Sequence, residues 1–257
     1  MPLEELLNDL RAAPRFLRNV TAWRTLPTQE AADHPWPPAL DPALISAAQR
    51  LGIPAPYSHQ AQAIDAVLQG KNAVMATGTA SGKTLGYVLP RLNALLHEPQ
   101  ATALLLFPTK ALAHDQMAAL GQWIDRLGGT IALSPYDGDT AKSHRAAIRS
   151  EARILVSNPD MLHLGILPHH TQWMRFFSGL RYVVLDEIHT YRGVFGSHIA
   201  NLLRRLRRTA RFYGTDPQFI AASATIANPQ SLAEALWEDP VTLVDADGAP
   251  YGQRHAI

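Results

Sequence analysis

The segment that most constrains the fold of this chain is Thr77–Thr84, which reads Thr-Gly-Thr-Ala-Ser-Gly-Lys-Thr. It follows the apolar run 72–76, which predicts a buried strand, and it precedes a Leu- and Val-rich pattern that predicts a core-facing helix. A strand, a loop of small residues ending in Gly-Lys-Thr, and a helix are typical of a phosphate-binding loop. Backbone N–H groups and the helix N-terminus would together favour an anion at one point. The segment therefore predicts a site for nucleotide phosphates.

The residue types of this loop suggest their roles. The ammonium of Lys83 would contact the β- and γ-phosphates, and the hydroxyl of Thr84 would bind Mg²⁺. The remaining residues expected to cradle the nucleotide are Thr79, Ala80, Ser81 and Gly82. The general pattern has a glycine where this chain has Thr77, so the loop taken alone leaves an ordinary helix start open.

A second element, at residues 180–189, argues against that alternative. Tyr182–Leu185 are apolar and β-prone, which predicts a central strand of a parallel sheet. Asp186 and Glu187 follow at its carboxyl end, where open α/β sheets bind ligands. Asp186 can bind the Mg²⁺ that Thr84 contacts, while Glu187 can accept a proton from an attacking water. The alternative is a solvated turn with two acids; together with the loop, the pair predicts an ATPase.

Composition limits the class of protein further. The chain has 257 residues, of which 47% are apolar and 18% charged, so it can bury a full α/β core. Its net charge of +1 gives no argument for nucleic acid, so any basic surface must be local. There is no cysteine, which excludes disulfides and thiolate metal sites and fits a cytoplasmic protein. No apolar run approaches the length that spans a bilayer, so no membrane partner is expected.

The chain alternates strands and helices from residue 72 onward. This alternation predicts an α/β fold with a mostly parallel sheet and helices on both faces. Residues 1–55 are punctuated by prolines and predict a separate, partly helical extension. The expected strands are Asn72–Ala76, Thr102–Phe107, Thr130–Leu133, Arg153–Ser157, Tyr182–Leu185, Phe219–Ser223 and Val241–Val244, and the expected helices include Ala111–Leu127, Lys142–Ser150 and His198–Phe212.

Polar residues beside helix starts suggest contacts to a base and to a nucleic acid. Tyr57 could stack on a purine, and the Gln60 amide could pair with it. Thr109 and Lys110 follow the second strand and could grip a backbone phosphate. The segment with Asn158 and Asp160 repeats this strand-to-helix arrangement. Each of these starts is also explained by helix capping alone.

Two further groups are less specific. Ser223 and Thr225 follow another apolar strand, and their hydroxyls could relay between His189 and a bound strand. A basic cluster, with Arg204, Arg208 and Arg211 on one helix face, is either a solvated surface or a contact with nucleic acid or a partner domain.

Taken in order, these motifs resemble the first RecA-like domain of superfamily 2 helicases of the DEAD/DEAH-box type, over nearly all of 57–244. The Thr-Gly-Thr-Ala-Ser-Gly-Lys loop and the run Leu-Asp-Glu-Ile-His-Thr-Tyr-Arg-Gly-Val-Phe-Gly-Ser-His resemble the Hrq-type branch, which includes the bacterial mitomycin repair factor A helicases. In that branch Thr77 is the usual residue. The resemblance implies a RecA-like P-loop NTPase domain over 56–245, preceded by the 1–55 extension.

The resemblance also implies activity and partners. It implies ATP-dependent 3′-to-5′ movement on single-stranded or tailed duplex DNA in DNA repair, with ATP and Mg²⁺ as cofactors. Gln60, with Tyr57, would recognise adenine, and His189 with Ser223 and Thr225 would couple hydrolysis to the strand. The residues placed on the nucleic-acid track would be Thr109, Lys110, Asn158 and Asp160.

One departure from the family is large. The family continues with a second RecA-like domain that carries the arginine fingers and with a C-terminal region, so residues 246–257 would begin the linker to a missing second domain. We therefore expect this chain alone to bind ATP weakly and hydrolyse it poorly. An RNA-remodelling ATPase of the same superfamily, and a non-catalytic module that only binds nucleic acid or a partner, remain the alternatives.

Overall fold

The computed structural model describes residues 2–256 of the chain. This part divides into two compact units, one formed by residues 2–32 with 249–256 and the other by residues 33–248. The segment 33–55, expected to belong to an N-terminal extension, is thus part of the larger unit. Its helix α3 (Pro42–Arg50) buries Leu44, Ala47 and Ala48 in the core of that unit.

The smaller unit pairs the two ends of the chain. It contains α1 (Leu3–Ala12), α2 (Pro14–Leu17) and the antiparallel strands β1 (Arg24–Leu26) and β9 (Arg254–Ala256). Thr25 lies opposite His255, and the backbones of Gln29 and Tyr251 bond to each other in both directions. This pairing of two short strands has no counterpart in the predictions.

The larger unit is built on a seven-stranded sheet in which every pair of neighbours is parallel. Its strand order is β4-β5-β3-β6-β7-β2-β8. The strands are β2 (Ala73–Met75), β3 (Thr102–Leu106), β4 (Leu133–Pro135), β5 (Ile154–Ser157), β6 (Leu180–Leu185), β7 (Gln218–Ala222) and β8 (Thr242–Val244). The predicted parallel sheet is confirmed, since continuous apolar runs are what strands buried on both faces require.

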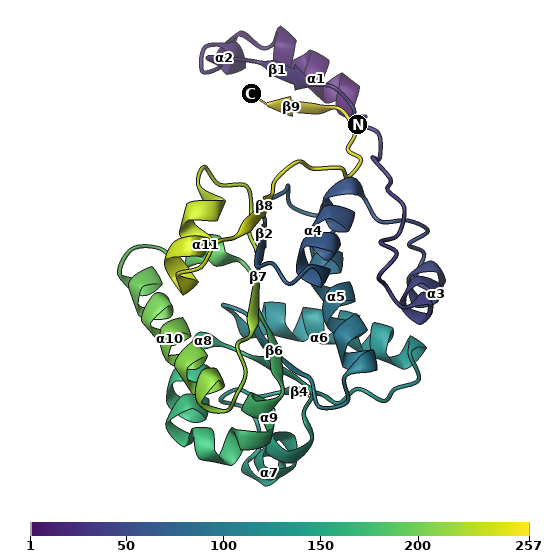
Figure 1. Cartoon of the computed structure of the whole chain (residues 1–257). Helices are drawn as coiled ribbons and strands as arrows, with labels where there is room; N and C mark the ends of the chain where they lie inside the picture. Colours follow the sequence, from purple (N-terminus) through teal and green to yellow (C-terminus); the bar gives the residue numbers. More distant parts are fainter. Residues whose placement is uncertain (1, 257) are drawn as a thin grey trace. The chain divides into compact units, whose positions relative to one another are not determined.

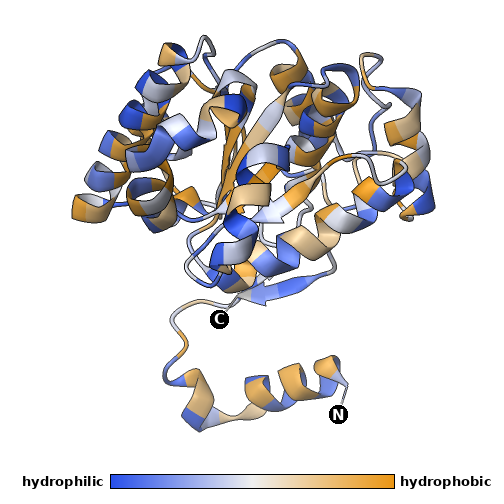
Figure 2. Cartoon of the chain, turned by 90° about the horizontal axis from the view of Figure 1, so that it is seen from below, coloured by the Kyte–Doolittle hydropathy of each residue, from blue (hydrophilic) through white to orange (hydrophobic). Residues whose placement is uncertain are grey.

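Helices cover both faces of the sheet (Figure 1). On one face, α3, α4 (Ser58–Leu68), α5 (Thr84–His97) and α6 (Lys110–Arg126) pack on side chains such as Met75 and Leu105. On the other, α9 (Met174–Ser178), α10 (Gly193–Phe212) and α11 (Pro229–Trp237) pack on Val74 and Leu104. Successive strand residues point to opposite faces, so each strand contributes side chains to the apolar core on both faces of the sheet. Figure 2 shows apolar colouring on strands of this sheet.

The remaining elements connect these layers. They are α7 (Lys142–Glu151), α8 (Pro159–Met161), a π-helical turn η1 (Leu162–Ile166), and the 3₁₀ segments η2 (Leu167–Trp173) and η3 (Ile188–Thr190). Helices α6 and α7 match their predicted spans to within one residue. Helix α10 begins five residues before the predicted His198. Its first turn contains two glycines, and its apolar residues Val194 and Phe195 are exposed, so the turn lacks the apolar periodicity of a buried helix face.

Candidate nucleotide and nucleic-acid site

Strand register brings the predicted motifs to one edge of the sheet. Met75 of β2 lies beside Ala222 of β7, and Ala221 lies beside Leu185 of β6. Each strand ends at about the same level, so the phosphate-binding loop, the acid pair and Ser223 leave the sheet side by side. This is the carboxyl edge, where ligands bind in sheets of this type.

The loop holds the ammonium of Lys83 in a defined place. Lys83 Nζ donates to the carbonyl oxygens of Thr77 at 3.0 Å and Gly78 at 2.7 Å. An ammonium has three donors, so the third can serve a phosphate. Burial lowers the pKa of Lys83, while the charges of Glu187, Asp186 and Asp247 oppose this shift.

The backbone of the loop is tightly shaped. Ala80 and Gly82 both have positive φ angles, of 61° and 77°. The hydroxyls of Thr77 and Ser81 lie 2.7 Å apart and are buried, which closes the loop from within. Thr77, at the position where the general pattern has glycine, therefore supports the loop through its side chain.

The acid pair follows β6 directly. Asp186 Oδ1 accepts from the N–H of Glu187 at 2.9 Å, and the Tyr87 hydroxyl donates to Asp186 Oδ2 at 3.2 Å. Burial raises the pKa of Asp186. A carboxylate desolvated in this way gains from a nearby cation, and with the Thr84 hydroxyl it offers the oxygen donors that Mg²⁺ takes alongside phosphates and waters. Among residues 2–256 no cluster of three or more His, Cys, Asp or Glu side chains could hold a metal by itself.

Glu187 adopts a left-handed backbone conformation, with φ 53°, which turns its side chain toward His189. Glu187 Oε2 lies 3.0 Å from His189 Nδ1, and the backbone N–H of Ala224 donates to the same nitrogen at 3.3 Å. The first contact requires a proton on Nδ1 and the second requires its lone pair, so only one can be fully formed at a time.

His189 thus lies between Glu187 and the segment after β7, and its contact with that segment is to the backbone N–H of Ala224. Ser223 is buried, and its hydroxyl donates to the carbonyl of Ala224 at 2.8 Å, while Thr225 is exposed. Neither hydroxyl contacts His189 in this conformation. The sequence analysis predicts coupling through the two hydroxyl side chains, and this stays a prediction. The contact of His189 with the N–H of Ala224 could not be predicted, because a backbone group gives no side-chain signal.

Gln60 holds the loop from α4. Its Oε1 accepts from the N–H of Tyr57 at 2.8 Å, and its Nε2 donates to Gly82 O at 2.9 Å. Only 5% of Gln60 is exposed. Both ends of the amide thus contact the chain itself in this conformation, beside the place where a base was expected to bind.

Two residues of this site were not expected from the sequence. His59 is fully buried; its Nε2 lies 3.0 Å from Ser81 O, and its Nδ1 accepts from the N–H of Gly248 at 3.1 Å. Asp247 Oδ2 accepts from the N–H of Gly78 at 3.0 Å. The sequence around His59 and Asp247 does not indicate these contacts, because the partners of both residues are distant in sequence.

The four residues expected on a nucleic-acid track follow two adjacent strands. β3 and β5 are neighbours, so the helix starts after them lie on the same sheet edge. Thr109 caps α6 by accepting from Leu112 N, and Asn158 Oδ1 caps α8 by accepting from Met161 N at 2.8 Å. Lys110 pairs with Asp139 on an exposed surface. The structure thus brings these positions together, and capping accounts for Thr109 and Asn158.

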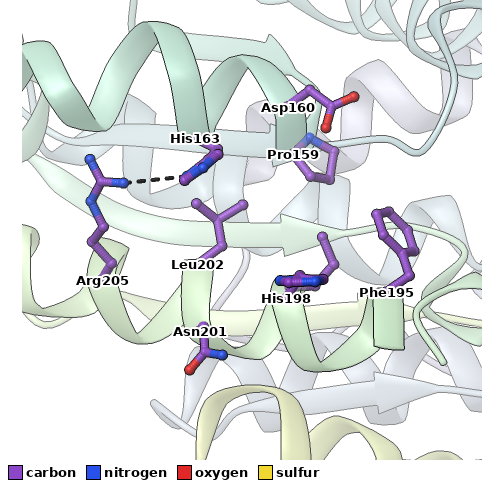
Figure 3. Close-up of a pocket in the computed structure, with 9 residues that line it drawn as sticks. Pro159, Asp160, His163, Phe195, His198, Asn201, Leu202 and Arg205 are labelled. Atoms are coloured by element: carbon purple, nitrogen blue, oxygen red, sulfur yellow. Dashed lines mark hydrogen bonds between the residues drawn. The ribbon is translucent and has the colours of Figure 1, made fainter. Parts of the chain in front are cut away.

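Asp160 lies at a pocket of about 390 Å³ between α8 and α10 (Figure 3). Arg205 donates to His163 Nδ1 at 3.3 Å across it. Phe195, one of its lining residues, is 47% exposed. The lining residues are Pro159, Asp160, His163, Phe195, His198, Ile199, Asn201, Leu202 and Arg205.

The arginine cluster on α10 is largely paired within the chain. Arg204 contacts Glu238 at 2.9 Å, and Arg211 contacts Asp216 at 2.9 Å. Arg207 bonds to both Asp216 and Asp239. Of the alternatives left open by the sequence, these contacts favour a solvated, ion-paired surface.

A parallel sheet with a phosphate-binding loop and an acid pair at one edge defines a nucleotide-binding domain of the RecA-like type. Comparison with family models matches residues 57–232 to the DEAD/DEAH box helicase model. This chain therefore belongs to the DEAD/DEAH box helicase family.

Individual relatives support this assignment. The chain is 48% identical over 255 residues to the uncharacterized ATP-dependent helicase YprA of Bacillus subtilis (strain 168), covering 99% of this chain and 34% of that protein. It is 43% identical over 206 residues to the ATP-dependent helicase HRQ1 of Saccharomyces cerevisiae, covering 78% of this chain and 19% of that protein. The expected Hrq-type resemblance is confirmed.

Solved structures give the same result. The DUF1998 helicase MrfA bound to DNA superposes with a TM-score of 0.94 at 48% identity, covering 99% of this chain and 36% of that one. A structure of MrfA bound to DNA and AMPPNP also gives a TM-score of 0.94, with 35% of that chain covered. The chain thus spans about a third of the length of these relatives. Within residues 2–256, no helix combines the length and the apolar character needed to cross a membrane.

Proposed function

We propose that this chain is the ATP-binding half of a DNA helicase that moves 3′-to-5′ on single-stranded or tailed duplex DNA in DNA repair, and that it works with a second RecA-like domain. The observation that carries the proposal is the meeting of Lys83, Thr84, Asp186 and Glu187 at the carboxyl edge of the sheet. The MrfA structures bound to DNA and AMPPNP support DNA and an adenine nucleotide as the partners.

The residues divide the work of ATP hydrolysis. The loop and Lys83, whose third donor remains for a phosphate, hold the triphosphate. Thr84 and Asp186 hold Mg²⁺, which neutralises charge on the phosphates when bound. Glu187 accepts a proton from the attacking water, and its contact with His189 orients the carboxylate.

His189 connects this chemistry to the segment after β7. Because its Nδ1 serves either Glu187 or the N–H of Ala224, a change in the Glu187 carboxylate changes the contact to Ala224. Ser223 and Thr225 lie in that segment. Thr109, Lys110, Asn158 and Asp160 contribute to the strand track, and Tyr57 with Gln60 recognises adenine once Gln60 exchanges a chain partner for the base.

Binding of a fluorescent AMPPNP analogue with Mg²⁺ to residues 1–257 tests the nucleotide site. We expect Lys83→Ala to weaken binding at least about tenfold, because a hydrogen bond between charged groups contributes about 1.5–3 kcal/mol. Lys71→Ala, at an exposed lysine, serves as the control. Equal affinity of the Lys83→Ala and unaltered chains would contradict the role of the loop.

Turnover tests the acid pair and separates the alternatives. The assay uses a longer protein in which this chain is joined to the proposed second RecA-like domain. In that protein, we expect Glu187→Gln to lower ATP hydrolysis about 10²–10⁴-fold and leave analogue binding unchanged, as loss of a general base requires. Undiminished hydrolysis would remove Glu187 from that role. Stimulation of hydrolysis by single-stranded DNA but not by RNA of the same length would distinguish a DNA helicase from an RNA-remodelling ATPase.

A further inference from the structure

The end of the larger unit is bonded to the phosphate-binding loop. Asp247 accepts from the N–H of Gly78 in the loop at 3.0 Å, and the next residue, Gly248, donates its N–H to His59. His59 in turn contacts Ser81 O, near the other end of the loop. The segment Asp245–Gly248 therefore reaches the loop twice, once directly and once through a buried imidazole.

The hydrogen bonds define the state of His59. Nδ1 accepts from Gly248, so the proton lies on Nε2 and is donated to Ser81 O at 3.0 Å. Burial lowers the pKa of His59, which agrees with a neutral ring. Asp247 Oδ1 lies 3.8 Å from Nδ1, too far for a hydrogen bond. The imidazole is thus a rigid neutral bridge between two backbone groups.

A single peptide group joins Asp247 to the phosphate-binding lysine. The carbonyl of Thr77 accepts from Lys83, and the N–H on the other side of the same peptide bond, that of Gly78, donates to Asp247. Hydrogen bonds on the two ends of one peptide polarise and strengthen each other. The packing is close as well, because a Cβ on Gly78 would lie 2.9 Å from Asp247 Oδ2.

The charges around Lys83 indicate that a bound nucleotide would weaken the attraction between Lys83 and Asp247. Three carboxylates act on this one ammonium: Glu187, Asp186 and Asp247. The proposed function gives the first two a chemical role and leaves Asp247 without one. A triphosphate, even with Mg²⁺, adds net negative charge beside Lys83, so it weakens the attraction that holds Asp247 and repels its carboxylate.

We propose that His59, Asp247 and Gly248 form a latch on the phosphate-binding loop, and that nucleotide binding releases the segment Asp245–Gly248 which the latch holds. This inference rests on the proposed function of the loop. Linkage makes the effect reciprocal: if the nucleotide loosens the latch, the latch lowers nucleotide affinity by the same factor. Asp247 is then a residue that sets nucleotide affinity, and His59 is a positioning residue of the loop.

Asp247→Asn is the direct test. The amide keeps the size of the side chain and an oxygen for the N–H of Gly78, but it removes the charge. We expect residues 1–257 with this change to bind the fluorescent AMPPNP analogue with Mg²⁺ at least about fivefold more tightly, the low end of usual coupling between sites. Asp245→Asn removes the same charge two residues away, at an exposed position, and should leave affinity unchanged.

Hydrogen exchange measures the release itself. In the unaltered chain, we expect the analogue to speed amide exchange in a peptide covering 245–250 while it slows exchange in the loop 77–84. In Asp247→Asn, exchange in 245–250 should already be fast without nucleotide. If Asp247 only affected nucleotide binding and did not hold this segment, exchange without nucleotide would be unchanged.

The outcomes distinguish the latch from the proposed function. If the unaltered chain does not bind the analogue at all, the proposed function of the loop fails. If it binds but Asp247→Asn has equal or weaker affinity, or exchange in 245–250 is unchanged by the analogue, the latch is wrong and the nucleotide site stands.

Discussion

At the scale of single residues, the burial of His59 makes the stability of the folded chain sensitive to pH. Its ring is fully buried, stacks with Tyr57 at a centroid distance of 6.0 Å, and faces the charges of Asp247 and Lys83. Desolvation is the largest influence, so the folded protein holds the pKa of His59 below the ordinary 6.5. The folded state therefore binds a proton less readily than the unfolded chain.

This shift predicts a loss of stability in acid. Above pH 6.5 His59 is neutral in both states and contributes no pH dependence; as pH falls below that value, the unfolded chain takes up the proton first and is favoured. We expect the melting temperature of residues 1–257 to fall between pH 7 and pH 5.5, and His59→Gln to reduce that slope. His169→Gln, at an exposed histidine, is the control. Identical slopes in His59→Gln and the unaltered chain would refute the prediction.

The positions of the proposed catalytic residues relative to strands and helices could be predicted from the sequence, because each lies within a few positions of its structural context. Helix α5 begins at Thr84, directly after Lys83, and Asp186 and Glu187 directly follow strand β6. The partners that hold them could not be predicted in the same way. Tyr87, which donates to Asp186, and His59, which contacts Ser81, meet the site across 99 and 22 positions of sequence.

At the scale of elements, the packing of α5 on β2 depends on one small residue. A Cβ on Gly86 of α5 would lie 2.4 Å from the sulfur of Met75 and 3.0 Å from Cβ of Ala63 in α4. Helix α5 can approach the sheet this closely only because Gly86 has no side chain. This approach matters for the site, because α5 begins at Thr84, directly after the phosphate-binding loop.

Two glycine-to-alanine changes in helices should therefore have opposite effects. Gly86→Ala should lower the free energy of unfolding by about 1–3 kcal/mol, because it overpacks the core. Gly121→Ala, in α6, meets nothing within 4 Å and should raise it by about 0.5–1 kcal/mol, through better helix propensity. Urea denaturation of both variants measures the difference. A Gly86→Ala variant as stable as the unaltered chain, or more stable, would show that Gly86 is not a packing constraint.

The elements also show where sequence patterns are sufficient. Strands buried on both faces, such as β2 and β3, are mostly apolar runs, and their bounds lie within one residue of the predicted ones. The edge strand β4 was expected at 130–133 but lies at Leu133–Pro135, because it is short, only half-buried and pairs with one neighbour. The π and 3₁₀ turns of η1 and η2 lack a 3.6-residue period, and β1 pairs with β9 across about 230 residues; neither has a local signal.

At the scale of the whole molecule, this chain matches one part of each longer relative. Residues 33–248 contain one RecA-like sheet, and the chain covers 34% of YprA and 36% of MrfA. In this superfamily, we expect the arginines that stabilise the transition state to come from a second RecA-like domain. Lys83 provides a positive charge beside the acid pair, and it belongs to the phosphate-binding loop.

Because residues 1–257 match about a third of the length of these relatives, we predict that binding and catalysis separate when these residues are assayed alone. An arginine finger contributes about 10³–10⁵ in rate, so we expect residues 1–257 to bind the AMPPNP analogue measurably yet hydrolyse ATP about 10³-fold more slowly than the longer protein with single-stranded DNA. A steady-state phosphate-release assay on both proteins makes the comparison, with Glu187→Gln as the background. If residues 1–257 hydrolysed ATP within about tenfold of the longer protein, the arginine contribution would have to come from this chain. The arginines of α10, which are paired with Glu238, Asp216 and Asp239, would then be the first to examine.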